Sequence, residues 1–131
     1  MRESAEQIRR KEKRFAVLNK RNGRCAYCGV CLKNEVWQID HIYPKKRYKI
    51  RIWDEDFIQG SDDISNLFPC CQSCNSSKCD LDLERFRVRI QNRLNDLNAN
   101  YSVYRMAKRF GLVTENKTHI VFYFETLTNN V

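Results

Sequence analysis

The chain has 131 residues, 42% of them hydrophobic and 31% charged, which suits one globular domain over residues 1–131 and excludes a disordered chain. No apolar run reaches the roughly 20 residues that a membrane span needs, and residues 1–15 lack the apolar core of a secretory signal, so we expect a cytoplasmic protein without a membrane partner. The formal net charge of +8 favours a polyanionic partner such as nucleic acid, although a soluble protein can be this basic without one.

Residues 1–22 form a basic N-terminal segment in which we expect a helix over residues 4–20. Ser4 and Gln7 have the spacing of a capping box, and Gly23 is suited to end the helix. Basic side chains outnumber acidic ones along the segment, which is typical either of a solvated face or of a helix that faces a phosphate backbone.

A strand is expected over residues 35–40, where apolar and polar residues alternate. It ends at Asp40 and His41, and the stretch from there to residue 63 has little periodicity, with basic residues first and acidic residues later. Loops of this length in compact domains are usually functional or mobile. An isolated Asp-His pair at a strand end is more often a structural hydrogen bond than a catalytic pair, so the neighbouring motifs must decide its role.

The C-terminal segment, residues 81–131, is expected to contain two helices and a strand. Apolar residues recur at spacings of three and four from about 81 to 98, which gives one apolar helix face. A shorter helix is expected over 101–110, ended by Gly111. Residues 119–126 are rich in β-branched and aromatic side chains, which favours a strand.

Seven cysteines, an odd number in a chain without an export signal, argue against a disulfide framework. Cys25 and Cys28 form one C-x-x-C pair, and Cys71 and Cys74 form another. Two such thiolate pairs can complete a tetrahedral Zn²⁺ site that is closed to water and therefore structural. Because binding energy at such a site is folding energy, loss of the zinc should unfold the centre of the domain.

A second choice of zinc ligands is open, because Cys28 and Cys31 also have C-x-x-C spacing and Cys70 lies beside Cys71. We favour the pair that begins at Cys25, since Gly29 follows it directly and a knuckle turn benefits from a residue that is free to take a positive φ. Three thiols then remain as small buried apolar side chains or spare thiols: Cys31, Cys70 and Cys79.

The cysteines and the polar residues near them occur in a specific order. The order is Cys25-x-x-Cys28-Gly29, Asp40-His41-Ile42-x-Pro44, Asn66-Leu67 and Cys71-x-x-Cys74-Asn75-x-x-Lys78. This set resembles the HNH endonuclease family, over about residues 20–80. The resemblance implies an α+β fold: a ββα-metal (HNH, or His-Me finger) core at residues 23–80 with a structural four-cysteine zinc site, flanked by an N-terminal helix and a C-terminal helical extension plus strand.

One position departs from the family name, because Asn75 stands where the third motif residue would be histidine. The resemblance includes members with asparagine there, so it still implies nuclease activity. An amide oxygen at this place suits a hard cation such as Mg²⁺. Taken alone, Asn75 would be interpreted as a helix cap, Asn66 as a turn residue and Lys78 as a surface lysine; their order between and after the cysteine pairs favours the nuclease interpretation.

Phosphodiester hydrolysis assigns a role to each of these residues. His41 is the expected general base, because imidazole has an unperturbed pKa of about 6.5 and can accept a proton at cellular pH. Asp40 and Asn75 would hold one Mg²⁺ or Mn²⁺ through oxygen atoms. Asn66 would fix the loop that carries His41. Lys78, about one helical turn after Asn75, would face the same phosphate.

The expected substrate is double-stranded or branched DNA, held through its phosphates. The sequence matches no helix-turn-helix or RNA-binding signature, so we expect sequence specificity to be weak or supplied by a protein partner. The chain could act as a monomer or a homodimer. The alternative function is a non-catalytic zinc-ribbon module that binds nucleic acid and does not need His41. The residues expected to contact nucleic acid are Lys78, Lys45, Lys46, Arg47, Arg10 and Arg14.

Overall fold

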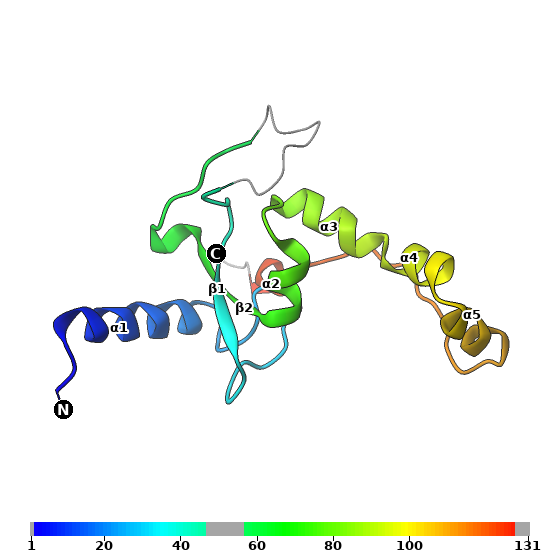
Figure 1. Ribbon diagram of the computed structural model, residues 1–131, viewed down its shortest axis with the longest axis horizontal. Helices are drawn as coiled ribbons and strands as arrows, with labels where there is room; N and C mark the ends of the chain where they lie inside the picture. Colours follow the sequence, from blue (N-terminus) through cyan, green and yellow to red (C-terminus); the bar gives the residue numbers. More distant parts are fainter. Residues whose placement is uncertain (1, 47–56, 128–131) are drawn as a thin grey trace. The chain divides into compact units, whose positions relative to one another are not determined.

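The computed structural model describes residues 2–46 and 57–127 (Figure 1). Contacts divide the chain into two compact units. We call the first the core unit; it comprises the residues up to Asp82 and those from Phe122 onward. The second, the helical unit, comprises Leu83–Val121. A single domain over residues 1–131 stays a prediction.

Helix α1, Ala5–Lys20, begins the core unit and agrees with the helix expected over residues 4–20. Its capping box is present as predicted: the Ser4 hydroxyl accepts a hydrogen bond from the Gln7 amide at 3.1 Å, and the Gln7 side chain accepts one from the Ser4 amide at 2.8 Å. The helix ends before two residues with positive φ, Asn22 and Gly23, so the local signals account for both of its ends.

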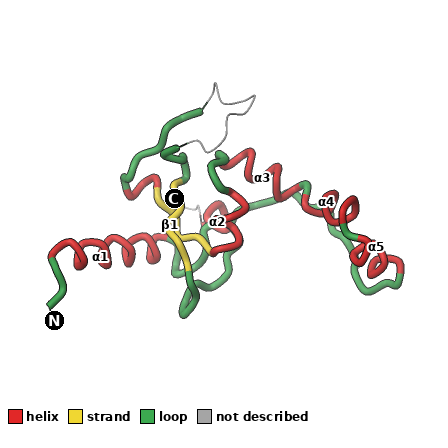
Figure 2. The backbone as a smooth tube through the Cα atoms, in the orientation of Figure 1, coloured by secondary structure: helices red, strands yellow, loops and turns green. Residues whose placement is uncertain are grey.

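The centre of the core unit is a two-stranded antiparallel sheet followed by a helix. Strands β1 (Trp37–His41) and β2 (Leu67–Cys71) pair so that His41 lies opposite Leu67. A short 3₁₀ helix η2, Ile64–Asn66, leads into β2, which continues directly into helix α2, Gln72–Lys78 (Figure 2). This mixture of helices with a small antiparallel sheet fits the expected α+β class and its β-β-α order.

A tight turn between α1 and β1 carries the first cysteine pair. The Cys25 amide donates to the Val30 carbonyl at 2.9 Å, and the Gly29 amide donates to the Cys25 carbonyl at 3.0 Å. Gly29 has a φ of +79°, so the positive φ expected there is confirmed. An added Cβ at Gly29 would also lie 3.3 Å from the Tyr123 ring, which shows that this turn is packed closely.

The prediction of a strand over residues 119–126 is wrong. Residues Tyr123–Leu127 instead form a 3₁₀ helix, η3. Its backbone bonds to the cysteine turn, with the Tyr123 amide donating to the Tyr27 carbonyl at 2.9 Å. The aromatic side chains that favoured a strand are used for packing: Phe122 is buried, and its ring centroid lies 5.2 Å from that of Tyr27.

The helical unit contains three short helices: α3 (Leu83–Gln91), α4 (Arg93–Asn100) and α5 (Ser102–Arg109). The single helix expected from 81 to 98 is interrupted at Asn92, whose ψ of 2° lies outside the helical range. The helix expected over 101–110 is present as α5, and Gly111 follows with a φ of +76°. None of the helices in the described part of the chain is long and apolar enough to cross a membrane.

Candidate metal centre and active site

Four cysteines converge where the turn after α1 meets the junction of β2 and α2. The sulfur atoms of Cys25, Cys28, Cys71 and Cys74 all lie within 4.8 Å of one another, and those of Cys28 and Cys71 are 3.8 Å apart. Tetrahedral zinc–thiolate bonds of about 2.3 Å would separate the sulfurs by about 3.8 Å. The geometry therefore fits a structural metal such as zinc, at the quartet that the sequence favoured.

The pKa values of three of these thiols are shifted in opposite directions. Hydrogen bonds from Cys70 and Cys74 hold the pKa of Cys25 well below its usual range. Burial raises the pKa of Cys28 to about 11, and hydrogen bonding to Cys25 together with burial raises the pKa of Cys74. Burial and neighbouring thiols thus disfavour the thiolate form of Cys28 and Cys74, whereas a bound dication would favour the thiolate form of its cysteine ligands.

The three remaining cysteines lie in different environments. Cys70 is fully buried, and its thiol donates to the Cys71 carbonyl at 3.3 Å. Cys31 and Cys79 are exposed. The expectation of small buried side chains therefore holds for Cys70, and the other two are solvent-accessible thiols.

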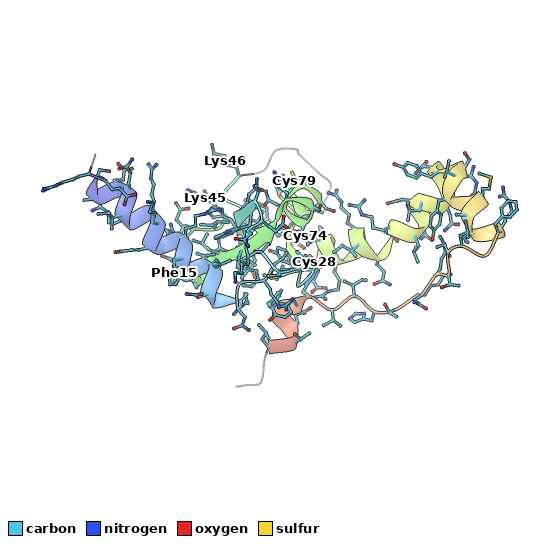
Figure 3. The ribbon with its side chains drawn as sticks, turned by 90° about the horizontal axis from the view of Figure 1, so that it is seen from below. Phe15, Cys28, Lys45, Lys46, Cys74 and Cys79 are labelled. Atoms are coloured by element: carbon cyan, nitrogen blue, oxygen red, sulfur yellow. The ribbon has the colours of Figure 1, made fainter. Side chains whose placement is uncertain are left out.

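A pocket of about 580 Å³ lies beside β1 and α2. It brings together several residues that the sequence singled out, since it contains Asp40 and His41 from β1, Asn75 from α2, and Lys45 and Lys46 from the loop after β1. Figure 3 shows Lys45, Lys46 and Cys79 above the labelled Cys28 and Cys74. The full lining among the described residues is Ile39, Asp40, His41, Pro44, Lys45, Lys46, Asn75, Ser76 and Cys79.

Asp40 is a buried carboxylate with two strong partners on one oxygen. Its Oδ2 accepts a hydrogen bond from the Tyr27 hydroxyl at 2.5 Å and lies 3.2 Å from the Lys78 ammonium. Burial raises the pKa of Asp40, and the charge of Lys78 opposes that rise. Burial and the neighbouring Asp40 raise the pKa of Tyr27, so the phenol stays a donor. Within the described residues the other carboxylate oxygen, Oδ1, accepts no hydrogen bond.

Lys78 is placed differently from the prediction that it meets a phosphate. Its side chain is fully buried, and Nζ also donates to the His41 carbonyl at 2.9 Å. The last turn of α2 faces β1, where a buried carboxylate requires a counter-charge. Lys78 therefore holds the strand that carries Asp40 and His41, and we correct its assignment as a nucleic-acid contact.

Two asparagines anchor the surroundings of His41. The side-chain nitrogen of Asn75 donates to the side-chain oxygen of Gln38. The side-chain oxygen of Asn75 accepts no hydrogen bond from any described residue. Asn66 is buried and bonds to Tyr43 twice, accepting from its amide at 2.8 Å and donating to its carbonyl at 3.0 Å. It also donates to the Ser61 carbonyl at 2.8 Å. Asn66 thus joins the backbone after His41 to the loop before η2; that this serves catalysis stays a prediction.

His41 lines the pocket, and its side chain contacts a carboxylate that the sequence reasoning missed. Its Nε2 is 2.8 Å from Oδ1 of Asp62, and Oδ2 of the same residue accepts from the Lys45 ammonium at 2.7 Å. These two partners hold the pKa of Asp62 at about 2. The only signal for this contact was the change from basic to acidic residues along the loop, which does not indicate which carboxylate meets the histidine.

The basic residues expected to bind nucleic acid have mixed surroundings. Arg10 is exposed and pairs with Glu6 at 2.5 Å. Arg14 lies 3.8 Å over the Trp37 ring and donates to the Trp37 carbonyl at 2.7 Å, so it docks α1 onto β1. Lys45 and Lys46 are exposed at the pocket, and Arg47 lies outside the described residues.

Comparison with known proteins matches the region of the chain that contains these residues. Residues 25–80 match the family model described as HNH endonuclease, a region that spans both cysteine pairs, the Asp-His motif and both asparagines. This region of the chain belongs to the HNH endonuclease family, as the ordered motifs indicated.

A relative among curated proteins is the SPbeta prophage-derived putative HNH endonuclease YoqL of Bacillus subtilis (strain 168), with 32% identity over 87 residues. The match covers 66% of this chain and 34% of the relative, so the chain spans about a third of that protein's length. No solved structure matches the chain.

Proposed function

We propose that the chain is a metal-dependent endonuclease that hydrolyses DNA phosphodiester bonds, with His41 as the general base. The observation that carries the proposal is the shared pocket, in which Asp40, His41 and Asn75 lie together with two lysines. Membership of the HNH family at residues 25–80 suggests nuclease activity on a nucleic acid. The cleavage activity, the mechanism and the choice of DNA as substrate are our proposal.

The residues at the pocket fit a divalent cation. Asp40 and Asn75 each keep one oxygen that no described residue hydrogen-bonds, and both residues line the same pocket. Carboxylate and amide oxygens are preferred by Mg²⁺ and Mn²⁺, and two protein ligands leave room for water and phosphate oxygens. When bound, such an ion would supply Lewis-acid stabilisation of the charge that develops on the phosphate and on the leaving oxygen.

The protein side chains at the pocket have separate roles in the proposed reaction. His41 accepts the proton of the attacking water, because it lines the pocket and imidazole is the base suited to neutral pH. Lys45 and Lys46 attract the phosphate backbone and hold it over the pocket. Asn66 keeps the backbone after His41 in place through its bonds to Tyr43.

The four-cysteine site stabilises the elements that carry the pocket residues. Cys74 directly precedes Asn75 on α2, and Cys71 ends the strand paired with β1. Zinc bound by the quartet would therefore hold the Asn75 helix against the strand that carries Asp40 and His41. We propose zinc for this site because four thiolates in tetrahedral arrangement are a common structural zinc site.

The alternative is a non-catalytic zinc-ribbon module that binds nucleic acid. One observation favours it: Lys78 lies 3.2 Å from Asp40 and neutralises part of the charge that would attract a cation. Such a module would keep the cysteines and the basic surface and would not depend on His41.

Cleavage of supercoiled plasmid separates the two functions. The parent protein with Mg²⁺ is expected to produce nicked or linear DNA, and neither EDTA-treated protein nor His41→Ala should do so. His119→Ala is the matched control, because this other histidine lies in the helical unit, outside the pocket lining. A folded His41→Ala variant that cuts as fast as the parent would refute the nuclease assignment of this residue. A salt-sensitive mobility shift without cleavage by any variant would favour the binding module.

A further inference from the structure

Asp62 bridges two residues of the candidate active site. Its two carboxylate oxygens are shared, with Oδ1 at 2.8 Å from Nε2 of His41 and Oδ2 at 2.7 Å from Nζ of Lys45. No other described residue hydrogen-bonds the His41 ring. Asp62 can therefore determine the orientation of the His41 ring.

The loop that carries Asp62 is held in place by backbone contacts. The Gly60 amide donates to the Pro44 carbonyl at 3.0 Å, and a Cβ at Gly60 would lie 1.6 Å from the Tyr43 carbonyl oxygen, so the close approach requires glycine. The Asn66 side chain donates to the Ser61 carbonyl at 2.8 Å. Asp62 thus follows two anchored residues, and its contact with His41 is defined by the backbone as well as by charge.

The hydrogen bond also selects the tautomer of a neutral His41. A carboxylate only accepts, so Nε2 must carry the proton that it donates to Asp62. The lone pair of the neutral ring is then on Nδ1, which is the nitrogen left to accept a proton from water. A base oriented by a third group in this way is a recurrent arrangement in hydrolytic enzymes.

We propose that Asp62 is a positioning residue for the DNA cleavage reaction, holding His41 with Nε2 protonated and Nδ1 available as the base. The inference rests on the proposed endonuclease function. It adds a residue from the loop before η2 to the motifs at residues 25–80, and it assigns the proton-accepting atom of His41.

Lys45 gives this proposal a distinctive test. An ammonium only donates, so in Asp62→Asn the new amide would turn its oxygen toward Lys45 and its NH₂ toward His41. Nε2 of the ring would then have to accept, and Nδ1 would carry the proton, which is the wrong tautomer. Asp62→Glu keeps a carboxylate, and because the Asp62 side chain is 58% exposed, the extra methylene can be accommodated.

The experiment measures kcat and KM for plasmid nicking by the parent and by Asp62→Ala, Asp62→Asn and Asp62→Glu. We expect kcat to fall roughly 10-fold or more for Ala and Asn, but less than for His41→Ala, whose loss should be about 10²- to 10⁴-fold. KM should change little, and Glu should retain the most activity. Asp63→Asn is the matched control, since this neighbouring exposed carboxylate bonds to Ser61 and not to the histidine.

The ranking of the kcat values of the Asp62 variants distinguishes a role in orienting His41 from a role in packing alone. A merely structural role would leave the isosteric Asn variant closest to the parent, and that result would overturn the inference. Faster cleavage by Asp62→Ala would also overturn it, because Asp62 would then restrain the base. Thermal melting of each variant checks that the fold is kept. If only the Asp62 variants cut like the parent, this inference fails alone; if His41→Ala does so as well, the proposed function fails with it.

Discussion

Replacing Lys78 with methionine tests whether the buried ion pair holds the core unit together. The Lys78 side chain is fully buried, that of Asp40 is 6% exposed, and their charged atoms are 3.2 Å apart. Methionine preserves most of the packing volume but leaves Asp40 without its cation and the His41 carbonyl without its donor. Removing one partner of a buried pair costs about 3–5 kcal/mol. The Tyr27 hydroxyl still bonds to Asp40, so we expect the lower end, about 3 kcal/mol.

Thermal unfolding of the zinc-loaded protein measures this loss directly. For a chain of this size about 3 kcal/mol corresponds to a fall of about 10 °C in the melting temperature. Lys46→Met is the matched control, because the same change at an exposed lysine should alter stability by less than about 0.5 kcal/mol. The double variant Asp40→Asn, Lys78→Met should recover part of the loss, since no buried charge is then left unpaired. A single variant that melts with the parent, or a double variant no more stable than the single one, would refute this reasoning.

Three further perturbations address the metal site, the loop and the cysteine turn. Cys74→Ala should abolish stoichiometric zinc, measured by atomic emission after gel filtration, and lower the melting temperature; zinc retained at one per chain would exclude this ligand. Asn66→Ala should cost about 2–3 kcal/mol, because it leaves Tyr43 backbone groups unpaired, and should also lower kcat; denaturant unfolding and plasmid nicking check both, and an unchanged midpoint would contradict the assigned bonds. Gly29→Ala should cost more than Gly23→Ala in denaturant titration, since both glycines have positive φ but only Gly29 would meet the Tyr123 ring at 3.3 Å; equal losses would show that the contact has no effect.

The elements that sequence reasoning predicted well are those with strong local signals. The capping box at Ser4 and Gln7 and the glycine after the helix define α1 without reference to the rest of the chain. The cysteine quartet was predictable because a metal site restricts both residue type and spacing. Gly29 helped to choose between two registers, and its φ of +79° agrees with that choice.

The strand expected over residues 119–126 failed because aromatic and β-branched residues report burial as much as they report strand geometry. Phe122 is buried, yet the backbone after it bonds to the turn at Tyr27 and then coils into η3. Only the tertiary position of the cysteine turn decides this outcome, and the turn lies nearly a hundred residues earlier in the sequence.

The role of Lys78 and the contact of Asp62 were beyond sequence reasoning for a related reason. A lysine in the last turn of a short helix is usually at the surface, and the buried carboxylate that attracts Lys78 comes from a distant strand. Asp62 is one of several acidic residues in its loop, and its meeting with His41 depends on the path that Gly60 and Asn66 impose. The residues of the candidate site were therefore predictable from motifs, whereas their partners were not.

The most direct test of the central claim is the single-turnover rate of cleavage of a labelled DNA duplex with Mg²⁺, measured for the parent, His41→Ala and His119→Ala at saturating protein. We predict that His119→Ala retains the parental rate and that His41→Ala loses about 10²-fold or more, as expected for removal of a general base. Equal rates for the parent and a folded His41→Ala variant would contradict the account.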